Sequence, residues 1–416
     1  MSEYRDIVIA GGGMVGVSLA LHLAAVLPRD TSLCMVEGFP LPQPVAGGSP
    51  DYHPSFDARS TALSYSSRLI YQDIGVWDAL SKWLCPIERI HVSSRGHFGS
   101  ALLEAGDYAW EALGYVVENA WLGNALIQSL YQRERVELIS PARVVTASPS
   151  AAGVSLQYEG ETSGTLQAGL LVVADGADSG LRRQLGVAVE ETPYGQQALI
   201  ANVGTAQSHR GCAFERFTDQ GPIAMLPLLP APGGDHRSAL VWTLPPEQAA
   251  ALLTCPQAEF LAALQERFGY RLGRLRQAGE RHAYPLTLTQ SAEQVRQGIV
   301  VMGNAAHALH PVAGQGFNLA LRDVAQLATT LAEGVGQGAR PGDLSVLQAY
   351  QGRQQADQAR TIEFSHHLPG LFMHPDPVLG VARDVGLAGL DVLAPLKREF
   401  VRYAAGVAGM GEPSGV

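Results

Sequence analysis

Cysteine is scarce in this chain, and the four cysteines that occur lie far apart. Cys34, Cys85, Cys212 and Cys255 form no CxxC pair and have no zinc-ligand spacing. The sequence therefore predicts no disulfide framework, no metal site and no dithiol redox centre. Isolated thiols are typical of a reducing compartment, so we expect a cytoplasmic protein.

Charged residues are also few, and the basic ones are outnumbered. Only 16% of the 416 residues are charged, and the formal net charge is −10. Such a chain lacks the basic footprint of nucleic-acid-binding proteins. The 46% of hydrophobic residues excludes a disordered chain and is enough for two domains with sizeable cores. Low surface charge also favours contact with a membrane or a partner protein.

The first apolar stretch, Ile7–Leu27, is long enough to be mistaken for a membrane span or a signal peptide. Two features argue against both. The six residues before it are acidic rather than basic, and the glycines at 11–13 and 16 would interrupt a spanning helix. The stretch instead predicts a buried strand ending at Ala10, a glycine-rich turn and a helix, with a second strand at Leu33–Val36.

The glycine-rich turn has the GxGxxG spacing of dinucleotide-binding βαβ units. In such units the first glycine permits a tight turn, the second lets the backbone approach a pyrophosphate, and the third lets helix and strand pack closely. An acidic acceptor for ribose hydroxyls follows about 20 residues later. The residues predicted to bind a dinucleotide are Gly11, Gly13, Met14, Val15, Gly16 and Glu37. The motif by itself does not distinguish FAD from NAD.

Two further glycine-marked turns follow apolar strands. Asp175-Gly176 comes after Leu170–Ala174, although a DG pair after a strand is often an ordinary turn. Gly303-Asn304 comes after Ile299–Met302 and leads through Pro311 to a helix start whose backbone N–H groups could face a ligand. Its predicted contacts are Gly314, Gln315, Gly316, Phe317 and Asn318. No second GxGxxG and no CxxxxC occur, which argues against a disulfide reductase.

These three motifs, in this order, resemble those of the p-hydroxybenzoate hydroxylase-like flavoprotein monooxygenases. A narrower resemblance, to the FAD-dependent hydroxylases of ubiquinone biosynthesis, runs from about residue 5 to about residue 400. It is closest to the 2-polyprenyl-6-methoxyphenol hydroxylase branch. The segments that carry it are Phe56–Ser64, Glu215–Thr218, Gly221–Pro227, Val241–Thr243 and Gly303–Leu319.

The resemblance implies FAD as the cofactor and NAD(P)H as a transient reductant. One oxygen atom of O₂ then passes to an electron-rich phenol through a flavin C4a-hydroperoxide. The first motif and Glu37 would hold the adenosine half of FAD, Asp175-Gly176 would lie near the pyrophosphate, and Gly303-Asn304 would hold the ribityl chain. Asn304 stands where the wider family has Asp, as is expected in this branch, and its amide can still bond a hydroxyl.

The resemblance further places Arg59 beside the flavin phosphates or ring, a role that suits a guanidinium; an ion pair with Asp57 is the alternative. It makes Asn124 the polar contact to the ribityl chain. The implied substrate is a polyprenylated phenol. Peripheral contact with the inner membrane and a ubiquinone-synthesis assembly are the implied partners, and homo-oligomerisation stays open.

The expected fold is α/β, with a Rossmann-like FAD-binding domain, an inserted mixed or antiparallel β-sheet substrate domain and a helical C-terminal region. Residues 1–75, 100–180 and 280–365 would form the first, residues 76–99 and 181–279 the second, and residues 366–416 the third. Four strands, each followed by a turn-rich segment, are expected in the insert, with a helix over Pro256–Arg271. The strands are Ala198–Val203, Cys212–Phe217, Ile223–Leu228 and Ser238–Thr243.

The sequence does not identify a catalytic base. A base would help because a phenol has a pKa near 10 and reacts better as phenolate. Tyr194, His282 and Tyr284 lie on segments that could reach a substrate, whereas isolated histidines such as His307 and His310 are more often structural. Sister ubiquinone hydroxylases acting at other ring positions are the nearest alternative function. A flavin-dependent prenyl reductase and a non-catalytic FAD-binding scaffold subunit are two others.

Overall fold

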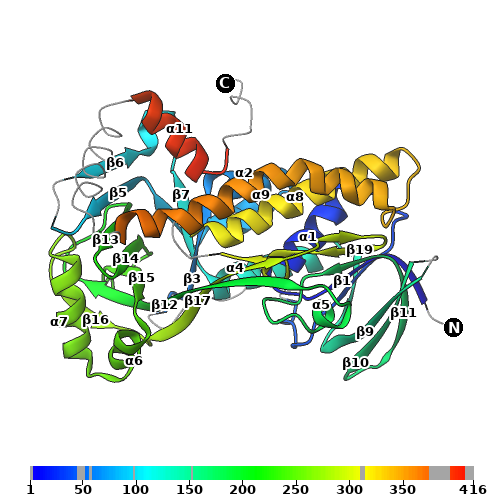
Figure 1. Cartoon of the computed structure of the whole chain (residues 1–416), viewed down its shortest axis with the longest axis horizontal. Coiled ribbons are helices and arrows are strands. Elements are labelled where there is room, and N and C mark those ends of the chain that lie inside the picture. The colour runs from blue at the N-terminus through cyan, green and yellow to red at the C-terminus, as the bar shows by residue number, and fades with distance from the viewer. Residues whose placement is uncertain are drawn as a thin grey trace.

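The computed structural model describes residues 3–44, 52–55, 59–96, 99–150, 153–309, 314–373 and 394–407. It contains three β-sheets, with helices packed between and around them (Figure 1). The expected α/β fold is confirmed, including a largely parallel first sheet and a second, mixed sheet.

The first sheet has the order β18-β19-β11-β1-β2-β8, and its strands from β19 to β8 run parallel. The hairpin strands β9 and β10 extend it, because β10 pairs antiparallel with β11 and β9 pairs antiparallel with β10. The bounds are β1 Glu3–Ala10, β2 Leu33–Val36, β8 Val136–Ile139, β9 Ala142–Ser150, β10 Gly153–Gly160, β11 Gly164–Val173, β18 Val295–Arg296 and β19 Ile299–Val301.

Strand β1 explains why this sheet is buried on both faces. Ile7, Val8 and Ile9 are fully buried and alternate between two separate apolar cores. Ile7 and Ile9 pack with the helices on one face, and Val8 packs with β9, β10 and β11 on the other. A short apolar run with β-branched residues is typical of such a parallel strand.

The second sheet has the order β20-β17-β12-β15-β14-β13-β5-β6, with β16 paired to β12. It is mixed, because β13 and β5 are parallel whereas the other pairs are antiparallel. The bounds are β5 Arg89–Ser94, β6 Ser100–Glu104, β12 Val189–Thr205, β13 Cys212–Thr218, β14 Gly221–Pro227, β15 Arg237–Leu244, β16 Leu275–Ala278, β17 His282–Ser291 and β20 His307–Ala308.

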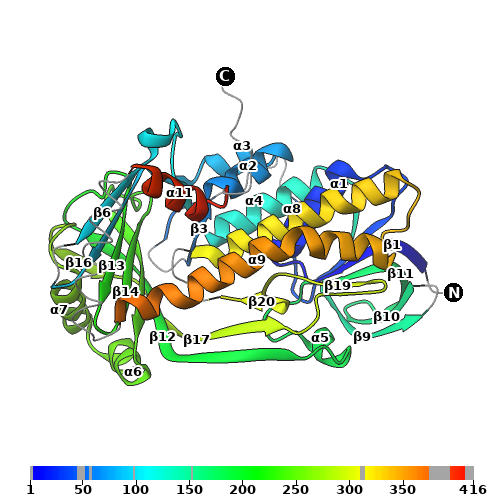
Figure 2. The ribbon, with the colours of Figure 1, turned by 45° about the horizontal axis from the view of Figure 1, so that its top comes forward.

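The long strands β12 and β17 belong to the second sheet and extend from it to the region of the first sheet (Figures 1 and 2). A third, small sheet has the order β3-β7-β4. Its bounds are β3 Ser60–Ser64, β7 Gly114–Glu118 and β4 Leu84–Ile87.

Helices α8 and α9 pack along each other above the first sheet in the view of Figure 1, and α1 packs against both α4 and α8. Helix α9 continues to the second sheet, where it packs against β13 and β14. The bounds are α1 Met14–Val26, α2 Tyr65–Asp73, α3 Trp77–Ser81, η1 Ala105–Tyr108, α4 Asn119–Tyr131, α5 Gly180–Gln184, α6 Pro246–Thr254, α7 Gln257–Phe268, η2 Gly303–Ala305, α8 Gln315–Gly336, α9 Leu344–Met373 and α11 Ala394–Ala404.

Several elements differ in length from the sequence expectation. Helix α7 ends at Phe268 rather than Arg271, because Gly269 follows with a positive φ of 88°. Strand β12 begins at Val189, well before the expected Ala198, because its first half pairs with β17. Helix α9 runs continuously through the predicted domain boundary at 365/366.

The expected membrane contact concerns the C-terminal residues 366–416, of which 374–393 and 408–416 lie outside the described residues. Within the part of the chain that is described, no helix is long and apolar enough to cross a membrane. Contact with a membrane or an assembly by this region stays a prediction.

A buried ion pair joins the third sheet to the second. Glu118 at the end of β7 lies 2.5 Å from Arg237 at the start of β15, and their side chains are 5% and 1% exposed. Tyr52 donates a hydrogen bond to Glu118, and Arg237 donates to the backbone carbonyls of Leu229 and Ser55. The pair therefore also holds residues 52–55, the segment that leads to β3.

We predict that Arg237→Met lowers the free energy of unfolding by about 3–5 kcal/mol, because it leaves the Glu118 carboxylate buried without its cation. The double variant Glu118→Leu/Arg237→Met should lose less than the sum of the two single losses, as urea unfolding would show. The matched control is Glu111→Gln, which removes an exposed partner of Arg68 and should cost less than about 1 kcal/mol. A loss of that small size for Arg237→Met would contradict the role of the pair.

Candidate functional site

The three glycine-marked turns meet at one edge of the first sheet. Parallel pairing places the ends of β1 and β11 side by side, with Ala10 opposite Val173 and the Ala174 N–H donating to the Ala10 carbonyl at 2.8 Å. The Met302 N–H, just after β19, donates to the Val173 carbonyl at 2.9 Å. The carboxyl ends of neighbouring parallel strands are the usual ligand site of such sheets.

Each glycine of the GxGxxG turn lacks a side chain for a different steric reason. A Cβ on Gly11, whose φ is +114°, would lie 2.4 Å from the Ala174 carbonyl oxygen. A Cβ on Gly16 would lie 1.9 Å from the carbonyl oxygen of Gly11. A Cβ on Gly13 would meet no atom within 4 Å, so this glycine keeps space open beside the N-terminus of α1. Helix α1 has no side-chain N-cap, so its first N–H groups can bind an anion.

Glu37 follows β2 and closes over this turn. Its carboxylate accepts hydrogen bonds from the backbone N–H groups of Gly12 and Phe39, the latter at 2.8 Å. Each carboxylate oxygen keeps further acceptor capacity, which a ribose hydroxyl could use. A Cβ on Gly12 would lie 2.8 Å from the Glu37 Cβ, so Gly12 belongs to the same arrangement, although it is not part of the GxGxxG spacing.

The later turns lie against the first one. Gly303 has a φ of +62°, and its missing Cβ would lie 3.1 Å from a methyl carbon of Val15. Asn304 is exposed beside it. Arg182, which is 4% exposed on α5, donates to the Ala305 carbonyl at 2.8 Å and so ties the Asp175-Gly176 region to the third turn. No pattern in the sequence indicates this role of Arg182.

The start of α8 is braced from within the protein. Gly314 is left-handed, with φ 61°, and the helix has no side-chain cap. The Asn318 amide accepts from the Ser64 N–H and the Ser67 hydroxyl and donates to the carbonyls of Ala62 and Gly314, at 2.6–2.9 Å. The side-chain amide of Asn318 is engaged in these four bonds. Any contact between Asn318 and a cofactor would therefore be made by its backbone.

The remaining predicted cofactor contacts at the start of α8 differ in their burial and in their partners. Gln315 is buried and donates to the Ala404 carbonyl, Phe317 packs into the core beside α1, and a Cβ on Gly316 would meet no atom within 4 Å. Pro311 and His310 lie outside the described residues.

A buried histidine holds the strand that precedes this helix. His307 Nε2 lies 2.6 Å from an oxygen of Asp323 on α8, and both side chains are about 1% exposed. The other oxygen of Asp323 accepts from Gln358 on α9 at 2.9 Å. His307 therefore has a structural partner, as is usual for an isolated buried histidine.

Arg59 lies where the second sheet approaches the start of β3. Its guanidinium donates to the Tyr284 hydroxyl at 3.3 Å, and both side chains are exposed. The alternative partner Asp57 lies outside the described residues. Asn124 is partly exposed on α4, and its role at the ribityl chain stays a prediction.

The candidate bases are placed differently from one another. The Tyr194 hydroxyl lies 3.0 Å from His366 Nδ1 on α9, and burial raises the pKa of Tyr194. His282 Nε2 lies 3.5 Å from the Glu280 carboxylate. None of these contacts singles out a base. Within the described residues, no group of three or more His, Cys, Asp and Glu side chains could hold a metal ion.

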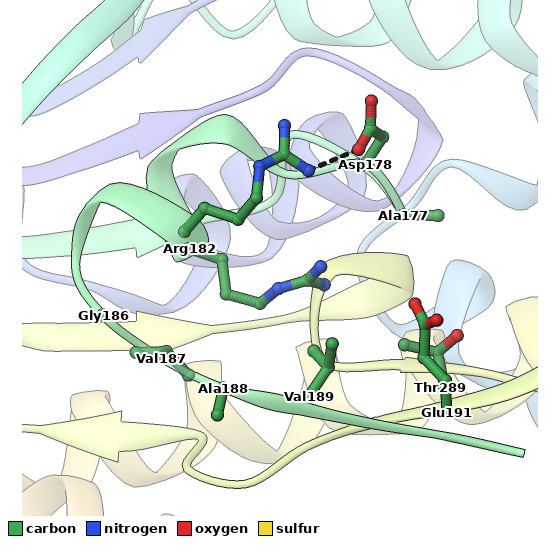
Figure 3. Close-up of a pocket in the computed structure, with 10 residues that line it drawn as sticks. Ala177, Asp178, Arg182, Gly186, Val187, Ala188, Val189, Glu191 and Thr289 are labelled. Atoms are coloured by element: carbon green, nitrogen blue, oxygen red, sulfur yellow. Dashed lines mark hydrogen bonds and ion pairs between the residues drawn. The ribbon is translucent and has the colours of Figure 1, made fainter.

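A pocket of about 590 Å³ opens beside the Asp175-Gly176 turn (Figure 3). One wall is formed by Ala177, Asp178, Arg182 and Arg183, and the other by Gly186–Val189, Glu191 and Thr289. Its charged side chains are Asp178, Arg182, Arg183 and Glu191, and Arg183 pairs with Asp178. The charges balance, so the pocket has no net attraction for anions.

Comparison with known proteins agrees with this geometry. The family described as FAD binding domain matches residues 53–365. The ubiquinone hydroxylase UbiL of Rhodospirillum rubrum is 34% identical, covering 98% of this chain and 91% of the relative. The 3-demethoxyubiquinol 3-hydroxylase of Escherichia coli is 30% identical, covering 98% and 100%. Among solved structures, p-nitrophenol 4-monooxygenase from Pseudomonas putida shares the fold with a TM-score of 0.76 at 18% identity, covering 99% and 100%.

We predict that Gly13→Ala and Gly16→Ala fail in different ways. Gly13→Ala should change the melting temperature little, because its Cβ has free space, and should weaken FAD binding at least tenfold by filling that space. Gly16→Ala should destabilise the apoprotein, because its Cβ would overlap the Gly11 carbonyl. Thermal melts of the apoproteins and FAD titrations followed by flavin fluorescence measure both effects. Wild-type FAD affinity in Gly13→Ala would contradict the placement of the pyrophosphate.

Proposed function

Since the chain belongs to the FAD-binding domain family and, within it, to the ubiquinone hydroxylases, we propose that it hydroxylates the ring of a polyprenylated phenol in ubiquinone biosynthesis. It is an FAD-dependent monooxygenase that uses NAD(P)H as reductant. The substrate class is proposed because the similarity to ubiquinone hydroxylases extends over nearly the whole chain. The likeness to two ubiquinone hydroxylases includes the second sheet, which would contact a substrate, as well as the FAD-binding turns.

The turns at the carboxyl edge of the first sheet suit the pyrophosphate of FAD, because Gly13 leaves space open beside the start of α1, which has no side-chain N-cap. We assign the pyrophosphate to Gly11, Gly13 and the N–H groups at Met14, Val15 and Gly16, with Glu37 accepting from the adenosine ribose. The further assigned contacts are Asp175, Gly176, Gly303, Asn304, Arg59, Asn124 and Pro311, with the helix start Gly314–Asn318.

The chemistry that bound FAD would supply is acceptance of a hydride from NAD(P)H and activation of O₂ for transfer of one oxygen atom to the ring. The chain's own contribution is positioning and electrostatics. The starts of α1 and α8, neither of which has a side-chain N-cap, present a positive dipole end, which stabilises negative charge on a bound group. The second sheet would shield the reacting ring from water, which the reaction needs in order to avoid losing oxygen as hydrogen peroxide.

The first substrate that we propose is 2-polyprenyl-6-methoxyphenol, the substrate of the branch that the sequence motifs resemble. A second candidate is a ring that lacks the 3-methoxy group, because the Escherichia coli relative is named a 3-demethoxyubiquinol 3-hydroxylase. A prenyl reductase or a scaffold subunit is a weaker alternative, because the chain is a monooxygenase.

We predict that the purified flavoprotein, given NADPH and short-chain 2-prenyl-6-methoxyphenol under ¹⁸O₂, forms a product with one added ¹⁸O atom. Mass spectrometry measures the added oxygen, and NMR of the product identifies the ring position. A control under argon should yield no product. Incorporation of hydrogen in place of oxygen would refute the hydroxylase, whereas turnover of the 3-demethoxy ring alone would select the second candidate.

A further inference from the structure

One row of side chains crosses the second sheet and differs from its neighbours in exposure. Pairing registers align Val92, Glu215, Ala224, Val241, Ile200 and His282 across β5, β13, β14, β15, β12 and β17. All six are partly exposed. The next residues on the same face of the three central strands in one direction, Pro222, Thr243 and Ala198, are buried. The row is therefore more exposed than the residues that follow it in this direction on the three central strands.

The opposite face of the same strands is covered by helices. Phe214 packs edge-on against Phe268 of α7, and Arg216 donates to the Arg267 carbonyl of α7. Because successive side chains of a strand alternate between faces, Glu215 lies on the face away from α7. Ala213, two residues before Glu215 and therefore on the same face of β13, packs with Ile87 of β4 and Val116 of β7, so Glu215 lies on the face toward the third sheet.

Glu215 is the one carboxylate in this row. Among the described residues, its oxygens make no hydrogen bond and no ion pair, while its row neighbours Val92 and Ala224 are apolar. Burial raises the pKa of Glu215 to about 7, and no charged neighbour contributes to the shift. A carboxylate without a protein partner in such surroundings costs stability, and such a cost is typical of a functional group.

We propose that Glu215 is the catalytic base that accepts the hydroxyl proton of the phenolic substrate. The inference rests on the proposed function, because it requires a phenol bound against this row. The apolar members of the row, Val92, Ala224, Val241 and Ile200, would contact the ring and the start of its prenyl chain.

The proton transfer involves only the phenol and Glu215. The phenol O–H bond breaks, its electron pair stays on the phenolate oxygen, and the proton moves to a Glu215 oxygen. Phenolate formation makes the ring electron-rich at the positions ortho and para to the oxygen, where hydroxylation takes place. The oxygen atom and the electrons come from O₂ and NAD(P)H, which the monooxygenase reaction already uses.

Other ionisable groups on the surrounding elements must be separated from Glu215 in any pH experiment. They include His282 on β17, Tyr194 on β12, His91 on β5, Glu363, His366 and His367 on α9, and the Glu118–Arg237 pair. Glu215 is neutral below its pKa and ionised above it, so hydroxylation that depends on it should rise with pH through about 7.

The test compares FAD-loaded wild type with Glu215→Gln and with the control Glu259→Gln, which lies exposed on α7 on the opposite side of the sheet. We expect Glu215→Gln to keep its FAD content and its NADPH oxidation without substrate. Product formation at pH 8 should fall about 100-fold or more, and the rise with pH near 7 should disappear. Glu259→Gln should match wild type. A Glu215→Gln enzyme with the wild-type rate and pH profile would overturn the proposal.

A binding measurement separates this proposal from the proposed function. The dissociation constants of a prenylated phenol and of its O-methyl ether are compared at pH 8 by flavin fluorescence, without turnover. Wild type should prefer the phenol by at least about tenfold, because a carboxylate accepts its hydroxyl proton, and Glu215→Gln should lose most of that preference. If wild type binds both ligands but hydroxylates neither substrate, the proposed function fails. An equal preference in wild type and variant overturns the role of Glu215 whether or not product forms.

Discussion

The close approach of backbone to backbone at the carboxyl edge of the first sheet is the constraint on which the site depends. The Ala174 carbonyl occupies the position of a Gly11 Cβ, and the Gly11 carbonyl occupies that of a Gly16 Cβ. No side chain could replace either glycine without moving β1, α1 or β11 apart. This packing leaves the N-terminus of α1 uncapped and open at Gly13, so the polar groups that the fold leaves free are the ones that can meet a phosphate.

A second constraint ties this edge to the rest of the molecule. The glycine turns are formed by the first sheet, but Arg59 and the Ser64–Ser67 hydroxyls come from a segment held by the third sheet and by the Glu118–Arg237 pair. The Asn318 amide then joins that segment to the start of α8. Loss of the buried pair would thus disturb the contacts around the cofactor edge from a distance, because one partner alone would be an uncompensated charge.

The sequence predicts the features that depend on residues close together in the chain, and it does not predict those that depend on distant partners. The strand Leu33–Val36 has the predicted bounds, because four consecutive apolar residues are buried by any parallel sheet. The glycine turn is equally local. The first half of β12 carries polar, exposed residues and forms a strand only through pairing with β17, nearly 100 residues away. The partners of Asn318 and Arg237 are likewise distant in the chain, so no local pattern could reveal that the predicted cofactor contact Asn318 is occupied by protein groups.

Glu215 shows why a site on a sheet face is hard to find in a sequence. Its neighbours in the chain, Phe214 and Arg216, belong to the opposite face, whereas Val92 and Ala224 become its neighbours only through the register of β5 and β14. A carboxylate inserted among apolar residues would ordinarily be selected against, because ionising it there costs free energy that an apolar residue would not cost. The same cost keeps its pKa close to neutral, and a group with such a pKa can take up and release a proton at the pH of the cell. The local loss of stability on β13 is therefore the physical condition for the chemistry that we assign to it.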